Sequence, residues 1–184
     1  MTKPREVGLD PNLSFASSPS GNHYLAAVLK ELRVQPGDAI IDLGCGKGSA
    51  MRTMLRFPFS EVDGLELSGE IAATAIANFE RLKERRSRIF IRDAREFTEF
   101  DRYNFIYLYN PFPAVIMDAV LVSVRESIGR VPREAVIIYA NPTCRDSLLR
   151  SGFREAYSRP GEWGNPITVF TSETLSASRL SAPR

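Results

Sequence analysis

The sequence DAIIDLGCGKG, residues 38–48, decides the fold. Its AIIDLG part is a short apolar run of the kind found in a strand that is buried on both faces. Gly44, Gly46 and Gly48 follow, as is typical where a backbone turns tightly and approaches a ligand closely. This stretch therefore predicts a buried strand, a ligand-binding loop and the start of a helix.

Helix-like and strand-like segments alternate along most of the chain, which predicts a mostly parallel sheet with helices on both faces. The last two strand-like segments, FREAYS and ITVFTS, are joined by the loop RPGEWGNP, so we expect a hairpin that adds one antiparallel strand at the edge. The fold class is therefore α/β, a three-layer Rossmann-like arrangement around a seven-stranded sheet. The expected helices are 20–34, 49–56, 69–86, 114–129 and 143–151, and the expected strands are 39–44, 62–67, 88–93, 103–110, 135–141, 153–158 and 167–172.

The length and composition indicate one soluble globular domain. Of the 184 residues, 43% are hydrophobic and 25% are charged, which is close to the average for such proteins. We expect this domain over residues 20–173, after a flexible arm at 1–19 and before a disordered tail at 174–184. Lys and Arg number 24 against 22 for Asp and Glu, a balance too slight to indicate a nucleic-acid-binding face from charge alone. The basic stretch ERLKERRSR at 80–88 is interpreted as a solvated helix face, with Glu80 and Glu84 pairing along it.

Cysteine usage and hydropathy favour a cytoplasmic protein. Cys45 and Cys144 are the only cysteines, and a disulfide at Cys45 would block the proposed ligand loop, so we expect reduced thiols. No stretch approaches the roughly 20 apolar residues that a membrane helix requires. Export and membrane insertion are therefore not expected.

Acidic residues end three of the expected strands. Ligands of such sheets collect at the carboxyl ends of the strands, near the point where the strand order reverses. Asp42 lies beside the glycines, where a carboxylate repels phosphate and suits a cation. Glu66 can accept both hydrogen bonds of a ribose diol, and Asp93 can accept one from an adenine amino group. Glu66 or Asp93 alone could instead be a helix cap, and Arg95 could make Asp93 a plain ion-pair member.

These motifs together resemble the class I S-adenosylmethionine-dependent methyltransferases. The resemblance rests on DLGCGKG, on GLELS, on RDA and on YNPF at 109–112, and it spans residues 20–171. It implies that the glycines line the methionine part of S-adenosylmethionine, that Asp42 acts near its amino group, that Glu66 binds the ribose and that Asp93 and Ala94 lie at the adenine. The implied cofactor-binding residues are Asp42, Gly44, Cys45, Gly46, Gly48, Glu66, Leu67, Asp93, Ala94 and Asn110, without a metal ion.

The segment NPFP at 110–113 is the expected catalytic centre. It is similar to the Asn-Pro-Pro-aromatic motif of amino-methylating enzymes, in which the Asn carbonyl and a backbone carbonyl accept hydrogen bonds from the nitrogen to be methylated. Here Phe112 replaces the second proline and Pro113 the aromatic residue, so the motif's substrate specificity does not carry over. The alternative is that Asn-Pro only starts a turn. Asn110, Pro111 and Phe112 are the predicted catalytic residues.

Two further segments are candidates for the acceptor site. Asn141, before Pro142, ends the fifth expected strand and could wall the acceptor together with Tyr139. Trp163, the only tryptophan, lies between Glu162 and Gly164 in the last loop, where edge-strand packing is the alternative.

The sequence thus predicts a methyltransferase that acts on a nitrogen of a protein side chain or small-molecule amine rather than on nucleic acid. Methyl transfer to an unprotonated amine needs alignment more than a strong base, and the single histidine, His23, is not expected to act as one. One alternative is an NAD(P)-dependent oxidoreductase, but its third glycine would fall at Ser49. A second is a non-catalytic S-adenosylmethionine-binding module. The acceptor and the oligomeric state do not follow from the sequence.

Overall fold

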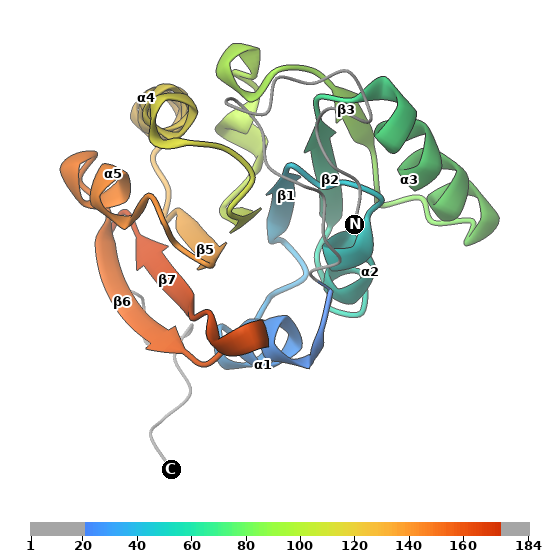
Figure 1. Cartoon of the computed structure of the whole chain (residues 1–184), viewed down its shortest axis with the longest axis horizontal. Coiled ribbons are helices and arrows are strands. Elements are labelled where there is room, and N and C mark those ends of the chain that lie inside the picture. The colour runs from blue at the N-terminus through green and yellow to red at the C-terminus, as the bar shows by residue number, and fades with distance from the viewer. Residues whose placement is uncertain (1–20, 174–184) are drawn as a thin grey trace.

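A computed structural model describes residues 21–173 of the chain. The arm expected at 1–19 and the tail expected at 174–184 lie outside the described residues. Seven strands form one sheet in the order β3-β2-β1-β4-β5-β7-β6, and Figure 1 shows helices covering it. The strands are β1 (Ala39–Leu43), β2 (Glu61–Glu66), β3 (Ile89–Ile91), β4 (Phe105–Tyr109), β5 (Val136–Ala140), β6 (Arg154–Arg159) and β7 (Ile167–Thr171).

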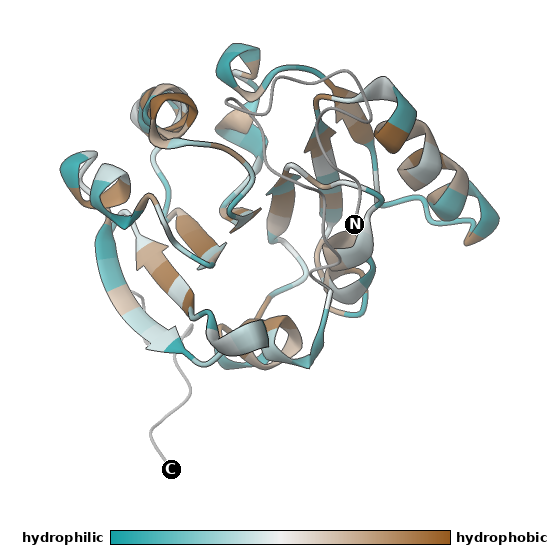
Figure 2. Ribbon diagram, viewed as in Figure 1, coloured by the Kyte–Doolittle hydropathy of each residue, from teal (hydrophilic) through white to brown (hydrophobic). Residues whose placement is uncertain are grey.

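The pairing of the strands confirms the predicted sheet. β1 pairs in parallel with β2 and β4, β2 with β3, and β4 with β5. The C-terminal hairpin provides the antiparallel edge, because β7 runs antiparallel to both of its neighbours, β5 and β6. β6 is the outermost strand and is exposed along its length, in agreement with its hydrophilic colour in Figure 2. Arg and Glu side chains on such an edge discourage pairing with other chains.

Two hydrophobic cores make the fold three layers deep. The five α-helices are α1 (His23–Glu31), α2 (Ser49–Met54), α3 (Gly69–Arg81), α4 (Ala114–Arg130) and α5 (Arg145–Arg150), and short 3-10 helices span Ala94–Glu96 (η2), Phe100–Arg102 (η3) and Glu162–Gly164 (η4). α1, α2 and α3 pack on one face of the sheet, and α4 and α5 pack on the other. β1 shows why its sequence is apolar apart from Asp42, since Ile40 enters the first core while Ile41 and Leu43 enter the second.

The end of α3 corrects one prediction. The helix expected over 69–86 stops at Arg81, because the chain turns and the Glu84 carboxylate accepts the backbone N–H groups of residues 85 and 86. The Arg86 guanidinium donates to three backbone carbonyls in the segment 55–59, at the end of α2. The interpretation of the basic stretch as a solvated helix face was therefore wrong, because part of it fastens α2 to the sheet.

The topology fixes where a ligand can bind. The chain passes outward from β1 to β2 and β3, and then returns to β4 on the other side of β1. The strand order therefore reverses between β1 and β4, and the segments that follow these strands meet at the ligand-binding edge of the sheet. Within residues 21–173, the helices are too short or too polar to cross a bilayer.

Candidate active site

The loop after β1 has the conformation that its glycines predict. Gly44, Gly46 and Gly48 have φ angles of 77°, 56° and 82°, in the left-handed region that other residues rarely adopt. The N–H groups of Gly44 and Cys45 both donate to the carbonyl of Leu65, at 2.8 and 3.0 Å. These bonds hold the loop at the carboxyl end of β2, so its remaining surface faces the ligand edge.

The glycine loop touches the segment after β4. A Cβ atom on Gly44 would lie 2.6 Å from Cβ of Pro111, closer than real side chains approach. The proposed cofactor loop and the proposed catalytic segment are therefore in direct contact.

Asp42 is a buried carboxylate beside this loop. Only 3% of the residue is exposed, and no hydrogen bond reaches the carboxylate from any residue of 21–173. Burial raises the pKa of Asp42 to about 8, and the negative charge of Glu66 adds to the effect. Among residues 21–173, Asp42 thus has no hydrogen-bond partner, and a cationic group of a ligand could pair with it.

Glu66 joins the end of β2 to the glycine loop. The residue is 7% exposed; its Oε2 accepts from the N–H of Gly46 at 3.0 Å and its Oε1 accepts from the N–H of Ser68 at 2.9 Å. A carboxylate has about four lone-pair positions, so each oxygen can still accept one ligand hydroxyl.

Asp93 is engaged by its neighbour Arg95. Both carboxylate oxygens bind the guanidinium, the shortest contact being 2.6 Å, and Oδ1 also accepts the N–H of Arg95. These hydrogen bonds hold the pKa of Asp93 below its usual value. Asp93 therefore forms the ion pair and the cap that the sequence left as alternatives. Its role at the adenine, with Ala94 and the half-exposed Leu67, stays a prediction.

Asn110 follows β4 in a strained conformation. Its φ angle is 40°, and its Oδ1 accepts a hydrogen bond of 2.5 Å from the hydroxyl of Thr143. Asn141, after β5, also has a positive φ angle, 52°, and its N–H donates to the carbonyl of Pro166. Both Asn-Pro pairs therefore form sharp corners at neighbouring strand ends. The sequence did not indicate Thr143, because only the fold brings it to Asn110.

Two predicted site residues are buried in the second core. Tyr139 has no exposed surface, and its hydroxyl accepts the N–H of Cys144. Phe112 is 6% exposed in the same core, and its carbonyl accepts a long contact from the Cys144 thiol. Tyr139 cannot wall an acceptor from this position, because no part of its side chain reaches the surface. The Phe112 side chain is therefore covered by the second core, and its place among the catalytic residues stays a prediction.

The loop between β6 and β7 closes the site from the side of α1. Trp163 meets the ring of Tyr109 edge to face, with ring centres 6.4 Å apart. Glu162 accepts a hydrogen bond of 2.9 Å from the side chain of Asn22, which precedes α1. These contacts bring the loop to the end of β4, and its role at the acceptor site stays a prediction.

The comparisons with known proteins place this arrangement in a family. A family model described as mycolic acid cyclopropane synthetase matches residues 21–120, more than half of the chain. The chain belongs to this family of S-adenosylmethionine-dependent methyltransferases. The matched residues run from the start of α1 into α4 and include the glycine loop, Glu66 and Asn110.

Other methyltransferases are similar to this family member. The ribosomal protein L11 methyltransferase of Nitrosomonas europaea is 29% identical over 70 residues, which are 38% of this chain and 22% of that protein. The glycopeptide N-methyltransferase MtfA has a TM-score of 0.66 at 14% identity, over 84% of this chain and 96% of that one. A methyltransferase from Aquifex aeolicus has a TM-score of 0.62 at 14% identity, over 81% and 89%. The chain's matches span about a fifth of the length of the curated relatives.

The residues of the site fit S-adenosylmethionine, the cofactor of this family. Its ammonium group would supply the cation that the buried Asp42 lacks, and the left-handed glycines leave the backbone open to close approach. Glu66 retains acceptor positions for a ribose diol.

Proposed function

We propose that the protein transfers a methyl group from S-adenosylmethionine to a nitrogen of a protein side chain or a small-molecule amine. The observation that carries the proposal is the contact of Pro111 with Gly44, which supports a position of Asn110 beside the predicted cofactor-binding loop. When bound, the cofactor supplies an activated methyl group. The chain's own residues would then orient the nitrogen toward it.

Asn110 is the residue proposed to orient the acceptor. Thr143 occupies one acceptor position of Asn110 Oδ1, which leaves the second for an N–H of the amine. The strained backbone of Asn110 is held between β4 and Pro111, so the amide has little freedom to turn away. The name of the structurally similar glycopeptide N-methyltransferase is consistent with a nitrogen acceptor. The family description refers instead to cyclopropane formation, so the acceptor atom is what an experiment must decide.

The cellular location and the class of acceptor are also part of the proposal. Cys45 and Cys144 are both free and buried, which supports the expected reducing, cytoplasmic location. The near balance of 24 Lys and Arg residues against 22 Asp and Glu residues gives no support for a duplex-binding surface, so we keep a protein or small molecule as the acceptor.

Asn110→Ala is expected to lower turnover about 100-fold while S-adenosylhomocysteine still binds, because the variant loses acceptor alignment whereas Asp42, Glu66 and the glycine loop keep the proposed cofactor contacts. The acceptor would first be found by a mass-shift screen over proteins, amino metabolites and nucleic acids, and turnover then measured on it. Thr143→Val is the companion variant: it removes the hydroxyl that orients Asn110 and should cost less than the alanine variant. Unchanged turnover in Asn110→Ala would remove this residue from the mechanism, and a methylated carbon in the product would overturn the nitrogen assignment.

Cofactor binding is expected to release a proton from Asp42. With its pKa at about 8, this carboxyl is mostly protonated at neutral pH, and a ligand ammonium beside it favours the ionised form. Titration calorimetry with S-adenosylhomocysteine at pH 7, in two buffers of different ionisation enthalpy, should show release of about one proton per ligand. Affinity should therefore rise as the pH increases toward 8.

Asp42→Asn provides the control for this linkage, since its side chain keeps the shape but cannot titrate. The variant should release no proton and show a flatter pH dependence. If Asp42→Asn released as many protons on ligand binding as the unaltered protein, the protons would come from a group other than Asp42.

A further inference from the structure

The loop at 160–166 holds its tryptophan outward. Trp163 is 68% exposed, although large apolar side chains of this size are usually covered. Its φ angle is 53°, which is uncommon for a bulky residue. The N–H of Asn165 donates to the carbonyl of Glu162, and a Cβ on Gly161 would collide with the carbonyl oxygen of Asn165. The loop is thus a tight turn that presents the indole to solvent.

The exposed indole lies next to the proposed catalytic segment. The ring of Tyr109 packs against Trp163 at an interplanar angle of 82°, and Tyr109 directly precedes Asn110. Tyr109 is half-buried at the end of β4 and so fixes one side of the indole. An aromatic pair therefore stands one residue away from the point where the acceptor nitrogen is proposed to bind.

A carboxylate without a cationic partner accompanies the aromatic pair. Glu162 accepts its hydrogen bond from Asn22, which is itself held as the cap of α1 by the N–H of Leu25. Among residues 21–173, no Lys, Arg or His side chain forms an ion pair with Glu162, whereas Glu31 nearby is paired with Arg159. The pKa of Tyr109 is raised by burial and then by the charge of Glu162, which directly precedes Trp163 in the chain.

We propose that Trp163, Tyr109 and Glu162 form a subsite for an ammonium group of the methyl acceptor. Aromatic faces attract cations within about 6 Å, and a neighbouring carboxylate adds a charge-assisted hydrogen bond. Glu162 is fixed by Asn22 and Trp163 by Tyr109, so the subsite is preorganised. That this ammonium belongs to the acceptor rests on the proposed function; binding of a cation at the subsite does not.

The subsite can be tested without turnover, because Trp163 is the only tryptophan of the chain and its fluorescence reports on the loop directly. The full-length protein would be titrated with n-butylammonium and, as a neutral molecule of similar size, with n-butanol. We expect a saturable change of Trp163 fluorescence with the ammonium and an affinity at least about tenfold weaker for the alcohol. Raising the KCl concentration from about 0.05 to about 0.5 M should weaken the binding of n-butylammonium and leave the binding of n-butanol unchanged. Equal responses to the two molecules would overturn the subsite.

Two matched variants test whether the Glu162 carboxylate binds the ammonium group. Glu162→Gln keeps an oxygen that can accept the hydrogen bond from Asn22, and it should lower the affinity for n-butylammonium about tenfold. Glu126→Gln, on the exposed side of α4, should leave this affinity unchanged. An unaltered affinity in Glu162→Gln would overturn the proposal. The salt dependence tests it even if this variant does not fold.

The same titration with saturating S-adenosylhomocysteine separates this proposal from the proposed function. Retained ammonium binding is expected, because an acceptor must bind together with the cofactor. Competition between the two would show that the subsite belongs to the cofactor and would overturn the proposal, while leaving methyl transfer in place. Conversely, ammonium binding without any binding of S-adenosylhomocysteine would overturn the methyltransferase assignment and retain a cation site.

Discussion

Glu66→Ala is expected to weaken S-adenosylhomocysteine binding by about 100-fold or more. The glutamate fixes the N–H groups of Gly46 and Ser68, and it is the proposed partner of the ribose diol. Hydrogen bonds to charged groups contribute about 1.5–3 kcal/mol each, so the loss of two such bonds corresponds to a factor of about 100 or more. Titration calorimetry measures this directly, with thermal unfolding as the check that the variant is folded.

Two further variants make the result specific. Glu70→Ala removes an exposed carboxylate from the first turn of α3 and should change the affinity by less than about twofold. Glu66→Gln keeps the shape but turns an amide NH₂ toward one of the two N–H donors, so we expect an intermediate loss. An affinity of Glu66→Ala equal to that of the unaltered protein would exclude Glu66 from the cofactor site.

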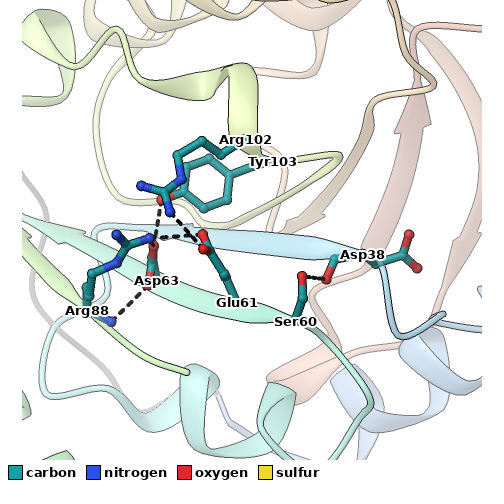
Figure 3. A network of polar contacts seen from close by, with 7 residues as sticks. All are labelled: Asp38, Ser60, Glu61, Asp63, Arg88, Arg102 and Tyr103. Carbon is teal, nitrogen blue, oxygen red and sulfur yellow. Dashed lines mark hydrogen bonds and ion pairs between the residues drawn. The ribbon is translucent and has the colours of Figure 1, made fainter. Parts of the chain in front are cut away.

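Asp63→Leu is expected to have the largest effect on stability. Asp63 is fully buried and accepts from the backbone N–H and the guanidinium of Arg88, both at 2.8 Å, and from the hydroxyl of Tyr103 at 2.7 Å (Figure 3). Leucine would remove the acceptor of the Tyr103 hydroxyl and of the Arg88 backbone N–H, while the half-exposed Arg88 guanidinium would keep its contact with Glu61. Each buried donor left unsatisfied costs about 1–3 kcal/mol, so the two together cost about 2–6 kcal/mol, a large part of the roughly 5–15 kcal/mol that stabilises a typical domain.

The neighbouring carboxylate serves as the control. Glu61 binds Arg88 and Arg102 in the same network, but its side chain is 33% exposed (Figure 3). Glu61→Gln should therefore lower the free energy of unfolding by less than about 1 kcal/mol in urea titrations. If Asp63→Leu were as stable as Glu61→Gln, the network would not contribute to stability as its geometry indicates.

The fold could be predicted because its signals are local. Continuous apolar runs mark β1, β4 and β5, and the glycines at 44, 46 and 48 mark the first turn. The end of α3 could not be predicted in the same way. Residues 82–86 have helix-forming side chains, but Arg86 finds carbonyls at the end of α2 that only the folded chain brings near.

Some residues of the candidate site could be predicted from the sequence, and others could not. Asp42 and Glu66 follow from their places at strand ends, and the structure brings both to the glycine loop. The contact of Thr143 with Asn110 joins residues 33 positions apart, and it has no signal in the sequence. Tyr139 was wrongly expected to reach the acceptor, because a strand pattern does not show that both faces of β5 are covered at that point.

Titration calorimetry of the unaltered protein with S-adenosylhomocysteine and with NAD tests the central claim most directly. The glycine loop, the buried Asp42 and the anchored Glu66 predict saturable binding of S-adenosylhomocysteine and no binding of NAD. Heat from NAD with none from S-adenosylhomocysteine would contradict the account and restore the oxidoreductase alternative.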